Sequence, residues 1–228
     1  MTYPTITFEE YKSYFEQFSK IDSAEKLAFC KRQYDGHLLH LEDEQFFEPL
    51  ALWSNDDIIS DYERNLNTIF QFDKIKENQF YFLVIPSFNP EHMLTIECQK
   101  ETYIMTLVTL SKNYWASFYA DNKTTDVAKT TISAELSQKV GKLLFPLLNK
   151  TITDARVPKA KGFTLDGVKY WLSNRYSDGQ RVVSKHSPDE TSKSGKIIEI
   201  MQTLIDNIED LNHSTLVSLE AKIKDIQD

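Results

Sequence analysis

The chain has 228 residues, of which 41% are hydrophobic and 12% aromatic, which is enough apolar material for a core and excludes a disordered protein. Its formal net charge of -8 argues against a nucleic-acid-binding protein, because such proteins neutralise phosphates with clustered lysine and arginine. No run approaches the ~20 apolar residues of a membrane-spanning helix, and two cysteines with no secretory signal favour a reducing cytosol. We therefore expect one cytoplasmic domain over residues 1–228 that binds neither nucleic acid nor membrane.

Residues 1–77 have helical periodicity. The apolar side chains of the first helix recur on one face: Phe8, Tyr11, Phe15 and Phe18. Thr7 and Glu10 are predicted to form a capping box at its start. A second helix is expected over about 23–34, with Asp22 and Glu25 as its capping box and Gly36 as its stop.

The rest of this first third is less regular. Residues 37–53 are ambiguous, because Phe46, Phe47 and Trp53 suggest a short helix while Pro49 restricts where one can begin. A third helix is expected after Ser54, since apolar residues again follow at helical spacing. Residues 1–77 are therefore interpreted as the helical part of the domain, and they carry 16 acidic and 8 basic side chains.

Residues 78–150 change to an extended pattern. Five segments are rich in aromatic and β-branched residues: 80–85, 93–99, 103–110, 114–120 and 127–132. The connections between them are too short for parallel strands, which need a crossover of about a dozen residues. We therefore predict an antiparallel five-strand meander, with the first strand inside the sheet. A helix over about 134–149 follows, capped by Ser133 and kinked or shortened by Pro146.

Residues 163–228 form the last part. Two strands, 168–172 and 181–185, are joined through Asp178-Gly179, which is a strong hairpin signal. An amphipathic helix around 197–208 and a final helix over 215–226 follow. The order of helices, meander, helix, hairpin and helices predicts the α+β class.

Three short clusters of polar and charged residues could have a function. His37 and His40 with the acidic residues 42–44 could hold a metal ion, but a loop with a solvated acidic run is the simpler interpretation. The aspartates at 56, 57 and 61 fit the first turn of a helix. Residues 192–196 lack the full phosphate-loop pattern, and anion binding at the helix N-terminus stays open.

No other chemistry-bearing pattern is found. Neither Cys30 nor Cys98 has a histidine beside it in sequence, and no nucleophile elbow or dinucleotide-binding pattern is present. We therefore expect no catalytic residue, no metal and no cofactor.

The hairpin carries the candidate binding residues: Tyr170, Trp171, Arg175, Arg181, Lys185 and His186. Alternation along the strand places Tyr170 on one face and Trp171 on the other. Trp, Tyr and Arg are enriched at the centres of interfaces, so this basic and aromatic surface is a candidate docking site. An ordinary amphipathic hairpin packed on one side is the alternative.

The segment from Thr164 to Trp171, followed by Asp178-Gly179 and by His186-Ser-Pro188 before a helix, resembles a pattern in uncharacterised bacterial α+β proteins. In that pattern a Leu-Asp-Gly strand pairs with a strand that ends in Ser-Pro, and a helix closes the domain. The resemblance covers about residues 163–208. It implies a scaffold and carries no activity.

The leading hypothesis is a non-enzymatic protein of the bacterial cytosol that binds another protein, as an inhibitor or immunity-type partner does. Acidic surfaces speed association with basic partners, which fits the charge of residues 1–77. The rival hypothesis is a small enzyme that acts on an anionic substrate at the 168–186 hairpin, through Tyr170 and His186. A third is a structural protein that uses its C-terminal helix as a coiled coil. The partner and the oligomeric state stay open.

Overall fold

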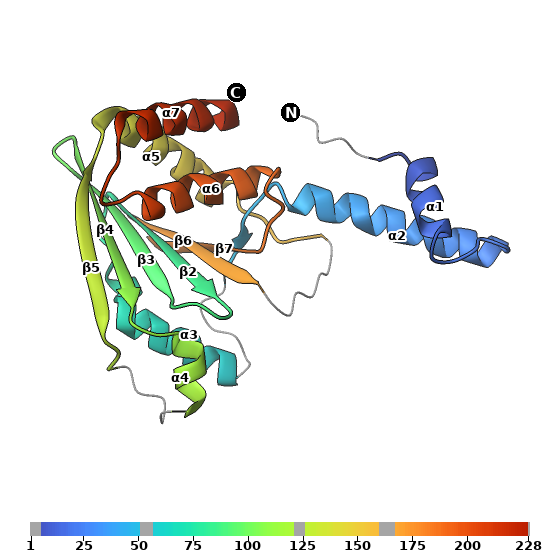
Figure 1. Cartoon of the computed structure of the whole chain (residues 1–228), viewed down its shortest axis with the longest axis horizontal. Coiled ribbons are helices and arrows are strands. Elements are labelled where there is room, and N and C mark those ends of the chain that lie inside the picture. Colours follow the sequence, from blue (N-terminus) through green and yellow to red (C-terminus); the bar gives the residue numbers. More distant parts are fainter. Residues whose placement is uncertain (1–5, 51–56, 121–125, 160–166, 228) are drawn as a thin grey trace.

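The computed structural model describes residues 6–50, 57–120, 126–159 and 167–227. Within these ranges the strands form one antiparallel sheet in the order β1-β7-β6-β2-β3-β4-β5 (Figure 1). The strands are β1 (Glu48–Pro49), β2 (Gln79–Pro86), β3 (His92–Gln99), β4 (Thr102–Leu110), β5 (Lys129–Leu136), β6 (Val168–Tyr176) and β7 (Gly179–His186). The expectation of an α+β fold with an antiparallel sheet is confirmed.

The helices are α1 (Phe8–Glu16), α2 (Ala24–Asp43), α3 (Asp57–Phe70), the 3-10 turn η1 (Phe72–Lys74), α4 (Tyr114–Ala120), α5 (Gln138–Thr153), α6 (Lys193–Asp206) and α7 (His213–Gln227). In Figure 1, α5, α6 and α7 cover one face of the sheet, and α3 and α4 lie against the other. No helix among the described residues is long and apolar enough to cross a membrane.

The interior strand β2 separates two apolar cores. Phe80, Phe82 and Val84 point into the core under α5, α6 and α7. Tyr81 and Leu83 point into the second core, which α3 and α4 close. Strand β2 pairs with β3 on one side and with β6 on the other, so it lies inside the sheet as the apolar run predicts. The hairpin thus extends the same sheet as the meander.

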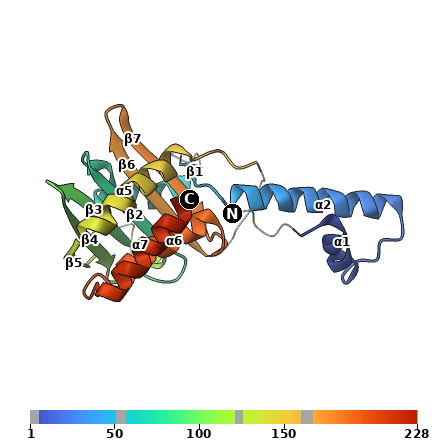
Figure 2. The same ribbon diagram turned by 90° about the horizontal axis from the view of Figure 1, so that it is seen from above.

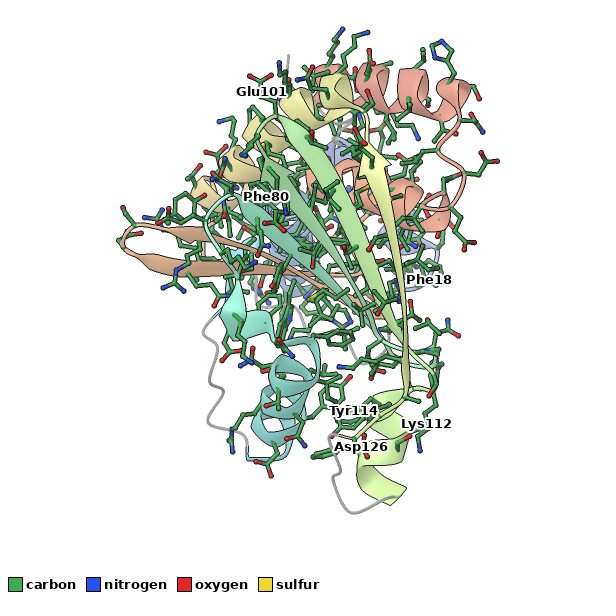
Figure 3. The ribbon with its side chains drawn as sticks, turned by 90° about the vertical axis from the view of Figure 1, so that its left-hand side faces the viewer. Phe18, Phe80, Glu101, Lys112, Tyr114 and Asp126 are labelled. Atoms are coloured by element: carbon green, nitrogen blue, oxygen red, sulfur yellow. The ribbon has the colours of Figure 1, made fainter. Side chains whose placement is uncertain are left out.

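The predicted five-strand meander is wrong at its fourth segment, because Tyr114–Ala120 is the helix α4. Its first backbone N–H groups find acceptors that favour a helix. The amides of Tyr114 and Trp115 donate to the Glu91 carboxylate at 2.7 and 3.1 Å, and Ala116 donates to Asn113 Oδ1 at 2.8 Å. Figure 3 shows Tyr114 between α3 and α4, where its ring stacks on that of Tyr62 with centroids 5.8 Å apart.

The strand that follows is longer than predicted. Residues 133–136 pair with β4 and continue β5 to Leu136, so α5 begins at Gln138 rather than at Ala134. Ser133 lies opposite Thr106 in the ladder, where their hydroxyl oxygens are 3.0 Å apart. Pro146 lies inside α5, which nevertheless continues to Thr153.

Helices α1 and α2 form an arm that projects from the body of the molecule (Figures 1 and 2). The capping box of Thr7 and Glu10 is confirmed. The predicted stop at Gly36 is wrong, because α2 runs through it to Asp43. Its cap is Ser23, whose hydroxyl accepts from the Lys26 amide at 3.2 Å, while Asp22 pairs with the Lys26 ammonium group.

Candidate functional site

The hairpin residues singled out by sequence do not form one surface. The register pairs Tyr170 with Lys185 and Lys169 with His186 at the open end of the hairpin, and Asn174 with Arg181 near the turn. At about 3.3 Å per residue, Arg175 lies roughly 16 Å along the strand from Tyr170. Directly opposite residues in an antiparallel pair share a face, so Tyr170 and His186 lie on opposite faces of the sheet. The structure therefore does not bring these two side chains together.

Two of the candidate residues are buried. Trp171 is 2% exposed, and its ring packs edge-on against Phe72 in the second core. Lys185 is 3% exposed, and its ammonium group donates to the Asp43 carbonyl at 2.9 Å, with Glu44 and Glu48 carboxylate oxygens at 3.6 and 3.7 Å. These side chains stabilise the fold and offer no surface to a partner.

The turn of the hairpin carries the exposed arginines. The Arg181 guanidinium donates to Asp178 at 2.8 Å, lies over the Tyr176 ring and holds the pKa of Asp178 below its usual range. Arg175 is exposed at the next ladder position towards the turn, opposite Gln180 and therefore on the other face of the hairpin. His186 lies at the other end, where burial and then the nearby Lys169 charge lower its pKa. The hairpin is therefore mostly a packed element with two arginines at its tip.

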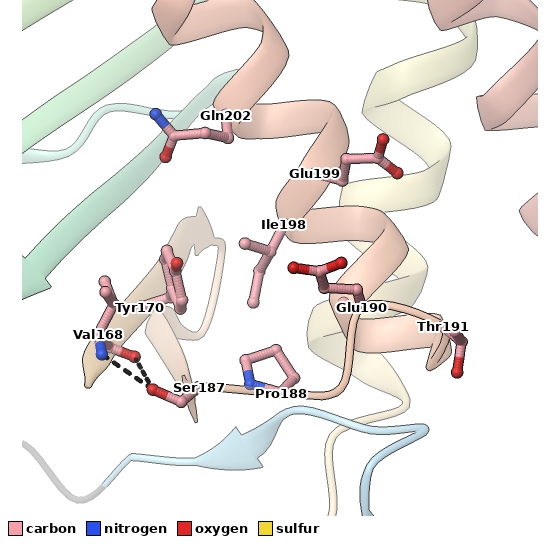
Figure 4. Close-up of a pocket in the computed structure, with 10 residues that line it drawn as sticks. Val168, Tyr170, Ser187, Pro188, Glu190, Thr191, Ile198, Glu199 and Gln202 are labelled. Carbon is pink, nitrogen blue, oxygen red and sulfur yellow. Dashed lines mark hydrogen bonds between the residues drawn. The ribbon is translucent and has the colours of Figure 1, made fainter. Parts of the chain in front are cut away.

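A pocket of about 640 Å³ opens beside the hairpin, between β6, the 187–192 loop and α6 (Figure 4). It is lined by Val168, Tyr170, Ser187, Pro188, Glu190, Thr191, Gly195, Ile198, Glu199 and Gln202. Gly195 allows the loop to approach the helix, because a Cβ there would lie 2.1 Å from the Asp189 carbonyl oxygen. Tyr170, which lines the pocket, is one of the binding residues predicted from the sequence.

The charges of this pocket do not favour an anionic substrate. The charged side chains in its lining are Glu190 and Glu199. The nearby start of α6 is also satisfied by the chain itself, since the Lys193 amide donates to Gln45 Oε1 and the Gly195 amide to Ser192 Oγ. Anion binding at this helix N-terminus therefore gains no support from the geometry.

The aromatic arm, defined as residues 6–43 (α1, α2, the connection between them and the two residues before α1), presents a second candidate surface. Its large exposed apolar side chains, with their exposed fractions, are Ile6 (39%), Tyr14 (59%), Phe18 (75%), Leu27 (40%), Phe29 (45%) and Leu39 (39%). No residue of α1 is buried, and in α2 only Cys30 and Asp43 are buried. The two helices meet through ring contacts such as Phe15 with Phe29 and Phe8 with Tyr34. Of the exposed aromatic residues, the sequence periodicity identified Phe18, as part of one apolar helix face, and did not identify Tyr14 or Phe29.

A buried polar network anchors the base of the arm. The acidic run 42–44, expected to be solvated, ends α2 and contacts the body. The Glu44 carboxylate accepts from the Asp189 amide at 2.9 Å, and the Ser194 hydroxyl donates to the Glu44 carbonyl. The Lys159 amide donates to Asp43 at 2.7 Å. The prediction of a solvated acidic run is therefore wrong, because residues 42–44 join β7, α6 and the connector after α5.

The histidines at 37 and 40 lie on α2. The His37 ring contacts Tyr11, with centroids 5.7 Å apart, and His40 Nε2 is 3.8 Å from Glu44. Across the described ranges, no three His, Cys, Asp or Glu side chains are arranged to hold a metal ion. No protein-family model, no curated protein and no solved structure matches this chain.

Proposed function

We propose that the protein functions by binding another protein through the aromatic arm, in the manner of an inhibitor or immunity-type partner. The observation that carries the proposal is the set of exposed aromatic side chains on the two projecting helices and on the connection between them. Phe18 is 75% exposed and Tyr14 is 59% exposed, although their rings contact each other with centroids 5.2 Å apart. Contiguous exposed apolar patches of this kind mark interaction sites in proteins.

The exposed apolar area of the arm matches what an interface needs. An enclosed aromatic side chain buries roughly 150–250 Å², so the exposed parts of Tyr14, Phe18 and Phe29 amount to on the order of 350 Å². The exposed aliphatic side chains of the arm add to this area. A standard interface takes about 800 Å² from each partner, of which roughly 450 Å² is apolar. The arm can therefore supply most of the apolar area of one partner.

The geometry of the arm also supports insertion into a groove. Helix α2 has 20 residues and is about 30 Å long, and its far half lies away from the sheet (Figure 2). An amphipathic helix that places apolar side chains in a groove is a common mode of recognition. Residues 6–43 carry eight acidic and five basic side chains, so the complementary surface is an apolar groove with a basic rim.

The test places a photoactivatable cross-linking residue in the full chain at Phe18, and in a control chain at Phe88. Phe88 is 81% exposed and lies between β2 and β3, outside the arm. In cells of the native source we expect a defined hetero-adduct from position 18 and none from position 88. Adducts of equal yield at both positions, or adducts of the chain with itself alone, would contradict the proposal.

The affinity of variants for the partner then identifies the side chains that bind it. With the cross-linked partner purified, the double substitution Tyr14→Ser and Phe18→Ser should weaken binding by about 2 kcal/mol or more, as expected for aromatic residues at an interface centre. The substitution Phe88→Ser should leave the affinity unchanged. Isothermal titration calorimetry measures both, and an unchanged affinity of the double variant would remove the arm from the interface.

A further inference from the structure

The pocket beside α6 is separate from the arm and has an apolar floor. Ile198 is 6% exposed, and Val168 and Pro188 lie around it. The Tyr170 ring stacks on Phe82, with centroids 5.7 Å apart and planes 16° from parallel, so its position is set by the core. The volume of about 640 Å³ falls in the range of small-molecule sites, roughly 300–1,000 Å³. The apolar residues of the floor can contact the apolar part of a ligand.

The polar groups around the floor are mainly acceptors. Gln202 donates its amide N–H to Asp206 at 2.8 Å, which leaves its Oε1 atom to accept. The Thr191 hydroxyl donates to Asp189, and Ser187 Oγ accepts from the Val168 amide at 2.9 Å. Figure 4 shows the Glu190 carboxylate beside Ile198, over the floor of the pocket. A ligand that fits this rim must donate hydrogen bonds.

The charge of the pocket points to one positive group on the ligand. Glu199 is paired with the Lys222 ammonium group of α7 at 2.7 Å. Within the described parts of the chain, Glu190 has no ion pair or hydrogen bond to its carboxylate, so its charge is not compensated. A carboxylate or phosphate ligand would be repelled there, whereas a cation would gain a charge-assisted hydrogen bond.

We propose that this pocket binds a small organic ammonium ion, with its apolar body on Ile198 and Tyr170 and its N–H groups on Glu190 and Gln202. Burial raises the pKa of the Tyr170 hydroxyl, which keeps that group neutral and able to accept from the same ligand. The site is independent of the aromatic arm. The proposed ligand is a cation, whereas the rival hypothesis for the hairpin expects an anionic substrate.

The test is an NMR titration of the full chain with three probes of similar shape and different charge: 2-phenylethylamine, 2-phenylethanol and 3-phenylpropionate. We expect the amine, at millimolar concentration, to shift the amide resonances of Thr191, Ile198 and Gln202 most strongly, and the anion to shift them least. Equal shifts with the three probes, or no shift with the amine, would overturn the proposal.

A matched pair of substitutions tests the role of the carboxylate. Glu190→Gln removes the uncompensated charge from an exposed position, and the amine should then bind about fivefold more weakly, the scale of a partly solvated ion pair. Glu209→Gln removes the same charge from an exposed position after α6 and should leave the affinity unchanged. Equal affinities of the two variants would show that Glu190 does not contact the ligand. The Tyr14→Ser, Phe18→Ser variant should bind the amine like the parent chain, which separates this test from that of the arm.

Discussion

Glu91 and His92 show how burial sets the role of an ionisable side chain. Glu91 is fully buried, and it accepts hydrogen bonds from Tyr62 and from the first two amides of α4. His92 follows it at the start of β3, where burial lowers the pKa of its imidazole. Its Nδ1 atom lies 3.2 Å from the Pro90 carbonyl, so it donates there, and within the described residues Nε2 is buried without a hydrogen-bond partner. Protonation would therefore place an N–H group where no acceptor lies.

The position of His92 makes part of the stability depend on pH. Because the folded state lowers its pKa, the unfolded chain binds this proton more readily, and stability falls as the pH drops below about 6.5, the usual pKa of histidine. We expect His92→Asn to reduce the loss of unfolding free energy between about pH 7 and about pH 5. Urea unfolding at a series of pH values measures the free energy of unfolding of the parent chain and of the variant. His213, which is exposed on α7, provides the control His213→Asn, and identical pH profiles of the two variants would contradict the prediction.

At the scale of single elements, α4 is the segment where local preference and tertiary context disagree. Its sequence Tyr-Trp-Ala-Ser-Phe-Tyr-Ala is rich in aromatic residues, which favour strands. Asn113 caps the helix through Oδ1 and also donates from its side-chain amide to the Asn89 carbonyl at 2.7 Å. Tyr114 and Phe118, four residues apart, then both reach Tyr62 on α3. Capping and packing therefore outweigh the intrinsic preference.

This account predicts that α4 depends on its cap. Asn113→Ala should destabilise the protein by about 1 kcal/mol, since it leaves the Ala116 amide without its acceptor. Asn113→Ser keeps a side-chain oxygen that caps well and should cost less. Denaturant unfolding followed by tryptophan fluorescence measures both. Equal losses for alanine and serine would show that the bond to Asn89, which both variants lack, matters more than the cap.

At the scale of the whole molecule, the body and the arm differ in how they are stabilised. The body has two apolar cores on the two faces of one sheet, and β2 contributes to both. The arm has two helices with few buried residues, and most of the stability of a helix in a protein comes from the packing of its apolar face. Among the described residues, buried polar contacts join the arm to the body at its base, around Glu44 and Lys185. The arm is thus the part whose stability a partner can change most.

Hydrogen exchange should report this difference. We expect the amides of α1 to exchange far faster than those of β2, because local opening of the arm exposes little buried surface. Binding of the partner should slow exchange over α1 and the first half of α2, while β2 stays unchanged. Mass spectrometry of exchanged peptides measures this, and α1 amides as protected as those of β2 in the unbound chain would refute the prediction.

The amino-acid sequence alone determined the elements whose signals are local. The capping box at Thr7, the apolar run of β2, the hairpin turn at Gly179 and the α+β class all follow from caps, spacing and turn residues. Of the candidate sites, the sequence predicted Tyr170 as a binding residue and placed Phe18 on an apolar helix face, but it did not predict the pocket or the exposure of the arm. These signals act over a few residues, so they can be read without knowing the fold.

Only the tertiary structure decided what depends on distant partners. Residues 114–120 are helical because their first amides donate to Glu91 and Asn113 and because Tyr114 and Phe118 pack on Tyr62. The pairing of β6 with β2 places the hairpin inside the sheet and buries Trp171. The pairing of β6 with β7 puts Tyr170 and His186 on opposite faces, and the loop before α6 brings Glu190 to Tyr170 to form the pocket. Burial, pairing and charge compensation are properties of groups far apart in the chain, so the exposure of the arm and the shape of the pocket emerge only when the sheet is assembled.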